Sequence, residues 1–326
     1  LAIKNIFAPF LAKSIAVASP IPLVAPVIKT FLFLISKLIT LISLYYYLLY
    51  FYDINIKKKP FIMDINLKNF NIAQCIHGIM VWPTNDSVIG KCLPLYGEWS
   101  EGENIIMSEY INEGDTVIDI GANIGTTVLS MSKNVGKTGK VIAFEPQLIM
   151  SQCLNTNLTL NDITNVDIYN LAISNKSGWA KLNDHEFSNI GRYGEAGISE
   201  KGTSIKTITL DEIELESCSL VKIDIEGHEW EAIQGAKNFL LNHKPALYLE
   251  AKKEITNTKK YIKWLFDNGW NCYWHFAFWY RENNIKNNKD NIFPGVGDMN
   301  ILAIYKDHNQ PKDLKKLENY DEDWDQ

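Results

Sequence analysis

A short β-branched run followed by a loop with two glycines constrains the fold of this chain more than any other segment. Residues 116–127 read TVIDIGANIGTT, with Asp119 near the end of the apolar run and Gly121 and Gly125 in the loop. The pattern predicts a strand, a tight turn and a helix, which together open a nucleotide-binding βαβ unit. Glycines in such a loop let the backbone approach a ligand where a Cβ would collide.

A second apolar run, KVIAF at 140–144, ends at Glu145 and Pro146. An acid about 20 residues beyond the glycine loop is typical of a side chain that accepts hydrogen bonds from both ribose hydroxyls of an adenosine. The two runs together therefore predict two neighbouring strands and an adenosine-containing ligand.

The glycine spacing distinguishes two classes of cofactor. Dinucleotide sites use G-x-G-x-x-G, so that a pyrophosphate sits on the helix amides, but here Asn123 stands in place of the middle glycine. A carboxylate such as Asp119 suits the sulfonium and ammonium groups of S-adenosylmethionine better than a pyrophosphate. We therefore expect S-adenosylmethionine, with Asp119, Gly121, Asn123 and Gly125 around its amino-acid part and Glu145 on its ribose. The alternative is an NAD(P)-dependent oxidoreductase.

Several downstream motifs carry a family resemblance. Residues 220–229 read LVKIDIEGHE, and AIQGA follows at 232–236. AFEP at 143–146, NLAIS at 170–174 and TLD at 209–211 accompany them. With VIDIGANIG, these segments resemble the FkbM family of S-adenosylmethionine-dependent methyltransferases, from about Val81 to Ile304. The resemblance implies an O-methyltransferase acting on a hydroxyl of a glycan, a lipid-linked sugar or a small metabolite.

The alternation of apolar runs and helical segments predicts an α/β class. The expected fold is a class I methyltransferase (Rossmann-like) doubly wound, mainly parallel sheet with an apolar N-terminal helical extension. The expected strands are 116–120, 141–145, 166–172, 221–225, 246–250, 271–276 and 300–305. The expected helices are 101–112, 126–134, 150–160, 229–242 and 258–268. Hairpins are expected at 79–83 with 87–89, and at 179–183 with 204–209.

Four parts of the chain follow from this pattern. They are an apolar N-terminal segment at 1–62, a leading segment at 63–112, a methyltransferase domain at 113–305 and a charged, frayed tail at 306–326. Within the domain, the polar stretch 281–298 is expected to form a mobile lid.

Residues 30–52 are apolar or aromatic nearly throughout, with Lys37 as the only charge. At ~1.5 Å per residue they would span a ~30 Å hydrocarbon core. The lysines at 57–59 would keep the following domain on the cytoplasmic side. The segment is thus a candidate membrane anchor. The alternatives are a buried helix, or a non-native extension with the natural start at Met63.

The overall charge and the cysteines exclude other classes. A net charge of −6 and a pI near 5.6 argue against nucleic acid as a partner, because phosphate contacts need a basic face. The five cysteines form no C-x-x-C pair, so neither a zinc site nor a disulfide framework is expected. Free thiols favour a cytoplasmic location.

Asp119, Glu145 and Asp224 all stand at predicted strand ends, so they should converge on one crevice. Methyl transfer to a hydroxyl needs a general base, and the candidates are Asp224, Glu226 and His228. Ala172 either packs beside the adenine or only fills a strand end.

Each candidate base has an alternative interpretation. Glu226 could instead cap the helix that starts near Glu229. The string Asp224, Glu226 and His228 could bind a divalent cation, although no metal is expected. A non-catalytic membrane-tethered binding protein that kept the fold is the last alternative.

Overall fold

The computed structural model describes residues 37–38, 68–183, 191, 193–252 and 256–322. The chain divides into two units, Leu1–Ile65 and Asn66–Gln326, and the description below concerns the second. The predicted N-terminal helical extension and the candidate anchor at 30–52 lie outside the described residues, apart from Lys37 and Leu38. Within the described ranges, no helix has both the length and the apolar character needed to cross a bilayer.

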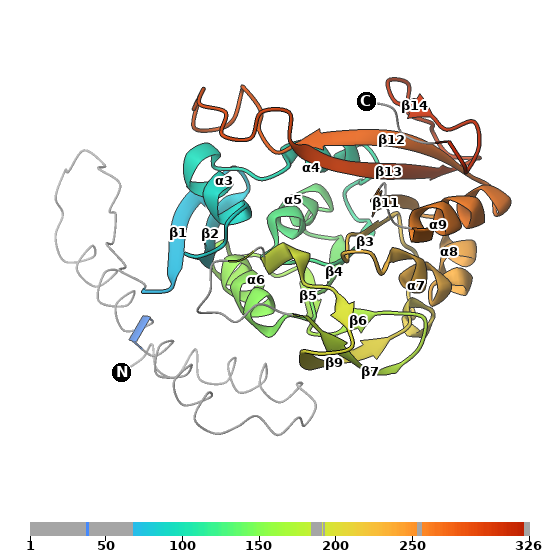
Figure 1. Ribbon diagram of the computed structural model, residues 1–326, viewed down its shortest axis with the longest axis horizontal. Helices are drawn as coiled ribbons and strands as arrows, with labels where there is room; N and C mark the ends of the chain where they lie inside the picture. The colour runs from blue at the N-terminus through green and yellow to red at the C-terminus, as the bar shows by residue number, and fades with distance from the viewer. Residues whose placement is uncertain (1–36, 39–67, 184–190, 192, 253–255, 323–326) are drawn as a thin grey trace. The chain divides into compact units, whose positions relative to one another are not determined.

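An eight-stranded sheet forms the centre of the unit, in the order β14-β12-β13-β11-β10-β3-β4-β5 (Figure 1). Strands β5, β4, β3, β10 and β11 are parallel, whereas β13 runs antiparallel to both of its neighbours. The strands are β3 (Thr116–Ile120), β4 (Lys140–Phe144), β5 (Val166–Tyr169), β10 (Leu220–Ile223), β11 (Ala246–Glu250), β12 (Trp270–Phe278), β13 (Gly297–Tyr305) and β14 (Lys315–Lys316). The predicted α/β class with a mainly parallel sheet is therefore confirmed.

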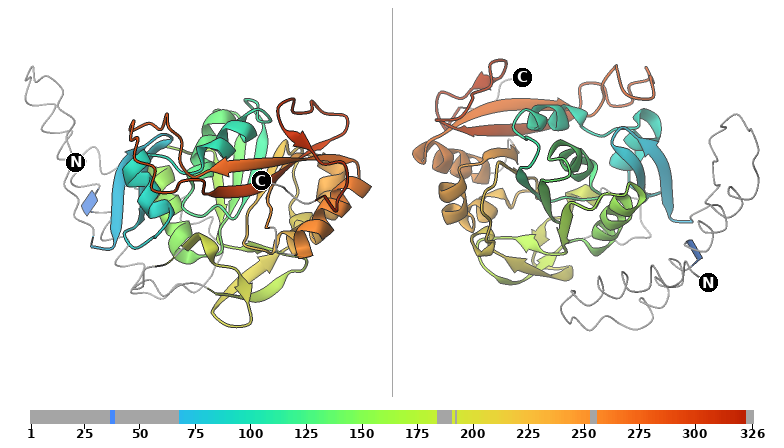
Figure 2. Two further views of the ribbon diagram at one scale, coloured as in Figure 1. Left: turned by 45° about the horizontal axis from the view of Figure 1, so that its top comes forward. Right: turned by 180° about the vertical axis from the view of Figure 1, so that it is seen from behind.

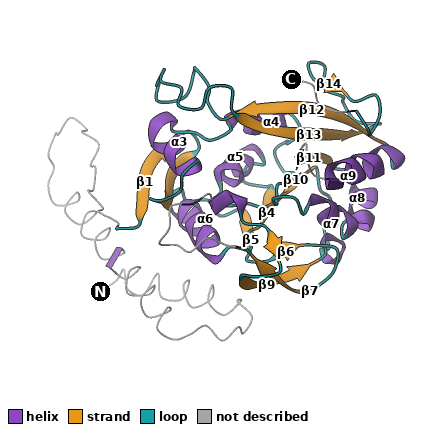
Figure 3. Cartoon of the chain, in the orientation of Figure 1, coloured by secondary structure: helices purple, strands orange, loops and turns teal. Residues whose placement is uncertain are grey.

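Helices cover both faces of this sheet (Figure 3). Because side chains alternate along a strand, Val117 packs into one apolar cluster and Ile118 into another. The first cluster includes residues of α4, α5 and α6, and the second includes residues of α7, α8 and α9. The helices are α3 (Ile89–Tyr96), α4 (Glu101–Ser108), α5 (Thr126–Asn134), α6 (Leu148–Leu160), α7 (Glu229–Gln234), α8 (Lys237–His243) and α9 (Thr256–Asp267).

Two smaller sheets flank the central one. A hairpin pairs β1 (Phe70–Cys75) with β2 (Gly78–Pro83). A four-stranded sheet in the order β6-β9-β7-β8 lies on the side of the unit opposite to β12 and β13 (Figure 2). Its strands are β6 (Ala172–Ile173), β7 (Gly178–Leu182), β8 (Ile198–Ser199) and β9 (Thr203–Ile208). Two 3₁₀ turns, Tyr193–Glu195 and Leu210–Glu212, complete the described elements.

The hairpin predicted from 79–83 with 87–89 is wrong. Strand β2 pairs instead with β1, which precedes it in the sequence, and residues Ile89–Tyr96 form α3. Asp86 starts this helix because its Oδ1 accepts hydrogen bonds from the amides of Val88 and Gly90, both at 2.9 Å.

Two predicted elements are split in the structure. The strand expected at 166–172 divides into β5 and β6, which belong to different sheets. The helix expected at 229–242 is interrupted at Gly235, where a Cβ would lie 2.0 Å from the carbonyl oxygen of Ser174. The close approach of Ser174 explains why residue 235 is a glycine; α7 ends at Gln234 and α8 begins at Lys237.

The tail and the predicted lid both make specific contacts with other parts of the unit. Strand β14 pairs with β12, and Leu317 behind it is fully buried, so the expectation of a frayed tail is wrong for this part. Arg281 binds both carboxylate oxygens of buried Glu98, at 2.7 and 3.0 Å. The hydroxyl of Tyr96 donates to the carbonyl of Asp290. These contacts tie the stretch 281–298 to Tyr96 and Glu98, and its predicted mobility stays a prediction.

Candidate active site

A cavity of about 320 Å³ lies at the carboxyl ends of the parallel strands. Ile120 to Asn123, Phe144 to Gln147, and Asp224 to Glu226 line it, directly after β3, β4 and β10. Glu250 at the end of β11 lines it too. Ligands of open α/β sheets bind in this crevice, so the predicted convergence of strand ends is where the geometry places a site.

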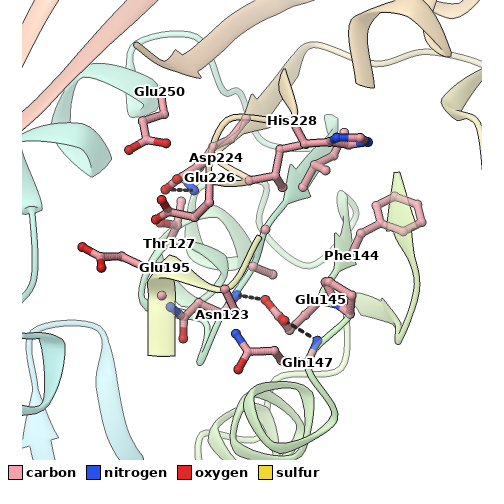
Figure 4. Close-up of a pocket in the computed structure, with 18 of the residues that line it drawn as sticks. Asn123, Thr127, Phe144, Glu145, Gln147, Glu195, Asp224, Glu226, His228 and Glu250 are labelled. Carbon is pink, nitrogen blue, oxygen red and sulfur yellow. Dashed lines mark hydrogen bonds and ion pairs between the residues drawn. The ribbon is translucent and has the colours of Figure 1, made fainter. Parts of the chain in front are cut away.

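Glu145 lies at one end of the cavity with both carboxylate oxygens held by backbone amides (Figure 4). Oε2 accepts from Asn123 N and Oε1 from Gln147 N, each at 2.7 Å. Asn123 reaches Glu145 because it adopts a left-handed conformation, φ 49°. Burial raises the pKa of Glu145 to about 7, although the two amide bonds oppose this.

The motif NLAIS holds the backbone that carries this carboxylate. The amide group of Asn170 donates to the backbone carbonyls of Glu145 and Pro146, at 2.8 and 3.0 Å. Ala172 in the same motif lines the cavity beside Leu171 and Ile173. The position of Ala172 fits an apolar neighbour of a ring, but its predicted contact with adenine stays a prediction.

Packing accounts for the two glycines of the loop, whereas the predicted approach of their backbone to a ligand stays a prediction. A Cβ on Gly121 would lie 1.9 Å from the carbonyl oxygen of Asp224, and one on Gly125 would lie 2.3 Å from Leu154 Cδ1. Both glycines also have positive φ, near 90°. Gly121 lines the cavity through its backbone, whereas Gly125 does not line it.

Asp119 does not line the cavity either, so the direct ligand contact predicted for it is not what the geometry favours. Its side chain is fully buried and faces Lys222 on the neighbouring strand, with Nζ 3.6 Å from Oδ1. The same ammonium lies 3.0 Å from Asp224 Oδ2. Lys222 therefore links the buried Asp119 to Asp224, which is 39% exposed and lines the cavity.

Three carboxylates gather at the other end of the cavity (Figure 4). Oxygens of Asp224, Glu226 and Glu250 all lie within 4.8 Å of one another. Lys252 pairs with Glu226 and lies 3.4 Å from Glu250 Oε2. Burial, reinforced by the neighbouring carboxylates, raises the pKa of Glu226 to about 7 and that of Glu250 to about 10.

His228 does not join this group. Its imidazole points away from the three carboxylates, its Nε2 lies 2.9 Å from Ser174 Oγ, and its Nδ1 lies 3.7 Å from Glu231. Burial lowers the pKa of His228. The predicted string of Asp224, Glu226 and His228 is therefore not one cluster of ligands, because Glu250 stands where His228 was expected.

The alternative role of Glu226 as a helix cap is also wrong. Helix α7 has no side-chain cap, and Glu229 Oε1 instead accepts hydrogen bonds from Gly227 N at 3.0 Å and Ile225 N at 3.2 Å in the loop before the helix. Glu226 instead adopts a left-handed conformation, φ 58°, and turns toward Lys252. A non-glycine residue held in this region is a strained feature that accompanies functional sites.

The sequence reasoning missed several residues that line the cavity. Glu250 could have been found, since it ends a predicted strand just as Glu145 does. Lys222 could also have been found, because a lysine inside a buried strand is exceptional. The others come from distant segments that no local pattern connects: Trp99, Glu103, Lys252, Trp279, Asp298 and Asn300.

The order of the seven strands from β5 to β12, with β13 antiparallel, is that of the class I methyltransferase fold. Residues 119–272 match the family model described as methyltransferase FkbM domain. These residues form a methyltransferase domain of the FkbM family, as the resemblance in the sequence predicted.

Individual relatives cover parts of the chain. Hexuronic acid methyltransferase AglP of Haloferax volcanii is 32% identical over 140 residues, which are 41% of this chain and 55% of the relative. The chain thus spans about half the length of this curated relative.

Two solved structures overlap the chain in part. The methyltransferase FkbM from Methylobacillus flagellatus KT has a TM-score of 0.40 at 16% identity, over 58% of this chain and 43% of that one. An S-adenosylmethionine-dependent O-methyltransferase from Thermotoga maritima has a TM-score of 0.41 at 13% identity, over 74% and 80%. The fold assignment rests on the strand order and the family match.

Proposed function

We propose that this protein is an S-adenosylmethionine-dependent O-methyltransferase that acts on a hydroxyl of a glycan, a lipid-linked sugar or a small metabolite. The match to the methyltransferase FkbM domain supports the reaction, and the sugar named for AglP supports the acceptor class. One observation carries the proposal. Glu145 and the group of Asp224, Glu226 and Glu250 occupy opposite ends of one cavity.

The residues at the Glu145 end suit an adenosine. Glu145 is a buried carboxylate whose orientation is fixed by two amides, and its remaining lone pairs are available to ribose hydroxyls. Phe144, Leu171 and Ala172 offer an apolar surface for the base. The backbone from Gly121 to Asn123 would hold the amino-acid part.

A dinucleotide suits the same loop less well. Asn123 N already donates to Glu145, so it is not free to bind a pyrophosphate. The carboxylates at the far end favour a sulfonium, which is positive, over a phosphate, which is negative. These two features support S-adenosylmethionine against the NAD(P) alternative.

Bound S-adenosylmethionine would supply the methyl group, and the chain would position the acceptor and remove its proton. Asp224 is the proposed base, because it is the most exposed of the three carboxylates and Lys222 fixes its direction. A general base contributes about 10²–10⁴-fold to such a step. Glu226 and His228 are then proposed to position the loop at 224–228 and not to take part in the proton transfer.

Calorimetry tests the cofactor. The protein should bind S-adenosylmethionine and S-adenosylhomocysteine but not NAD. Glu145→Ala should weaken binding by about 2 kcal/mol, because a charged acceptor of hydrogen bonds is lost. Glu109→Ala, at an exposed site outside the cavity, is the matched control. Equal binding by the two variants would remove Glu145 from the cofactor site.

The cysteines support a proposal for the cellular location. All five cysteines lie within the described residues, where they are free and buried, which supports a cytoplasmic location. Association with a membrane through 30–52 stays a prediction, since that segment falls almost wholly outside the described residues.

A further inference from the structure

We infer that the acceptor carries no negatively charged group beside the methylated hydroxyl, so that the site takes a neutral or amino-bearing sugar in preference to a uronic acid. This inference rests on the proposed function and concerns the half of the cavity away from Glu145. It would separate this protein from a relative that is named for a hexuronic acid.

Carboxyl side chains outnumber lysines in this half of the cavity. We call it the acceptor end and define it by five carboxylates that line the cavity: Glu103, Asp224, Glu226, Glu250 and Asp298. Among the described residues that line the cavity, the only lysines are Lys222 and Lys252, and there is no arginine. Binding of a carboxylate or phosphate normally relies on arginine or an unpaired lysine.

Both lysines are already committed to carboxylates of the protein. Lys222 is 5% exposed and lies between Asp224 and the buried Asp119. Lys252 lies between Glu226 and Glu250. An anionic acceptor would have to displace one of these pairs and leave a carboxylate alone in a confined space, which is costly.

The cofactor and two of these carboxyl groups reduce the negative charge at the acceptor end. S-adenosylmethionine carries a sulfonium, an ammonium and a carboxylate, so it adds one net positive charge. Burial and neighbouring carboxylates raise the pKa of Glu103 to about 8 and that of Glu250 to about 10, so both are largely protonated near pH 7 and add little negative charge. The selectivity therefore rests on the lack of an uncommitted lysine or arginine among the described lining residues, and not on the number of carboxylates.

The shape of the acceptor end favours a sugar ring. Trp99 and Trp279 both line the cavity, and their ring centroids lie 5.0 Å apart. Trp279 Nε1 donates to Asp298 Oδ2 at 2.6 Å, so this indole and a carboxylate present adjoining apolar and accepting surfaces. A pyranose presents C–H groups on its faces and hydroxyls on its rim, which matches that combination. An ammonium on the rim would also meet carboxylates.

Matched sugars test the inference without requiring turnover. The full chain, saturated with S-adenosylhomocysteine, is titrated with methyl glycosides in the gluco, galacto and manno series. Each series contains the neutral sugar, its 2-amino-2-deoxy form and its uronic acid, and binding is measured by calorimetry and ligand-observed NMR. In the series that binds, the uronic acid should bind at least ~10-fold more weakly than the other two, because charge repulsion is strong in a partly buried site.

Two variants attribute the selectivity to the acceptor end. Asp298→Asn removes one negative charge from the cavity. It should reduce the ratio of the affinity for the neutral sugar to the affinity for the uronic acid about threefold or more. Asp290 also lies in the stretch 281–298, but it is exposed and outside the cavity. Asp290→Asn should therefore leave this affinity ratio unchanged.

The outcomes are distinguishable. A uronic acid that binds as well as the neutral sugar overturns the inference and leaves the proposed function intact. Binding of S-adenosylhomocysteine with no sugar from any series also overturns it. Failure to bind S-adenosylhomocysteine at all contradicts the proposed function itself.

Discussion

The carbonyl oxygen of Asp224 occupies the place that a Cβ on Gly121 would take, with only 1.9 Å between the two positions. The glycine loop after β3 and the acidic loop after β10 are therefore packed backbone against backbone. Strands β3 and β10 are parallel neighbours, with Ile120 opposite Ile223, so both loops leave the sheet at the same level. This contact joins the loop that reaches Glu145 through Asn123 to the loop that carries Asp224 and Glu226.

The first prediction concerns that contact. Gly121→Ala should lower the free energy of unfolding by about 1–3 kcal/mol from positive-φ strain alone, and by more if the loops must separate. It should also weaken binding of S-adenosylhomocysteine. Gly102→Ala, in α4 with no atom closer than 3.9 Å to the new Cβ, should be neutral or slightly stabilising. Thermal denaturation compares the two, and equal effects would refute the packing argument.

The second prediction concerns the proposed base. Asp224→Asn keeps the shape and removes the charge, so methyl transfer should fall at least ~10²-fold while affinity for S-adenosylhomocysteine changes little. His228→Ala should cost less, because the imidazole points away from the carboxylates. Rates are measured on an acceptor found by screening for a +14 Da product. Full activity of Asp224→Asn would move the base elsewhere.

The third prediction concerns the buried lysine. Lys222→Met leaves Asp119 without its cation, and breaking a buried pair costs about 3–5 kcal/mol. The double variant Lys222→Met with Asp119→Asn should recover part of this loss, because the isolated charge is gone. Urea denaturation gives both values. If the double variant were as unstable as the sum of two independent losses, the pair would not be coupled.

The fourth prediction concerns pH. The pKa of Glu145 is raised to about 7, so its carboxyl is largely protonated at pH 6. Ribose hydroxyls donate best to the charged form, so affinity for S-adenosylhomocysteine should fall up to about tenfold from pH 8 to pH 6. Folding responds in the opposite direction, since a raised acid pKa makes this group less favourable to folding as pH rises toward 7. Glu145→Gln should flatten the binding profile in calorimetry, and an unchanged slope would assign it to another group.

The fifth prediction concerns the N-terminal segment. All described residues that line the cavity belong to Asn66–Gln326, so a chain that begins at Met63 should fold and bind S-adenosylhomocysteine as the full chain does. If 30–52 is an anchor, the full chain should stay with membranes after a carbonate wash. Release by carbonate would refute the anchor, and loss of binding in the shorter chain would show that the first unit is needed.

The sequence predicted most of the central sheet because its parallel strands are short runs rich in apolar residues, and β4, β10 and β11 end at or just before an acid. It failed where tertiary packing decides the outcome. The helix expected at 229–242 is interrupted at Gly235, which packs against the carbonyl of Ser174, and residues 166–172 read as one strand although two sheets share them. Neither neighbour is visible from local periodicity.

The candidate site was predictable to the extent that strand ends mark it. Glu145 and Asp224 followed from that rule, and Glu250 would have followed had the rule been applied to the fifth strand. Asp119 also stands near a strand end, but its side chain faces Lys222 and not the cavity. The register between β3 and β10 places Lys222 opposite Asp119, and this register cannot be seen from the position of Asp119 along its own strand.

The walls of the acceptor end come from both sides of the matched domain. Trp99 and Glu103 precede residues 119–272, and Trp279, Asp298 and Asn300 follow them. Asp224, Glu226 and Glu250 lie inside the matched residues, so the acceptor end is encoded partly inside and partly outside them. A match confined to residues 119–272 therefore carries no information about the part of the cavity wall that the flanking segments build.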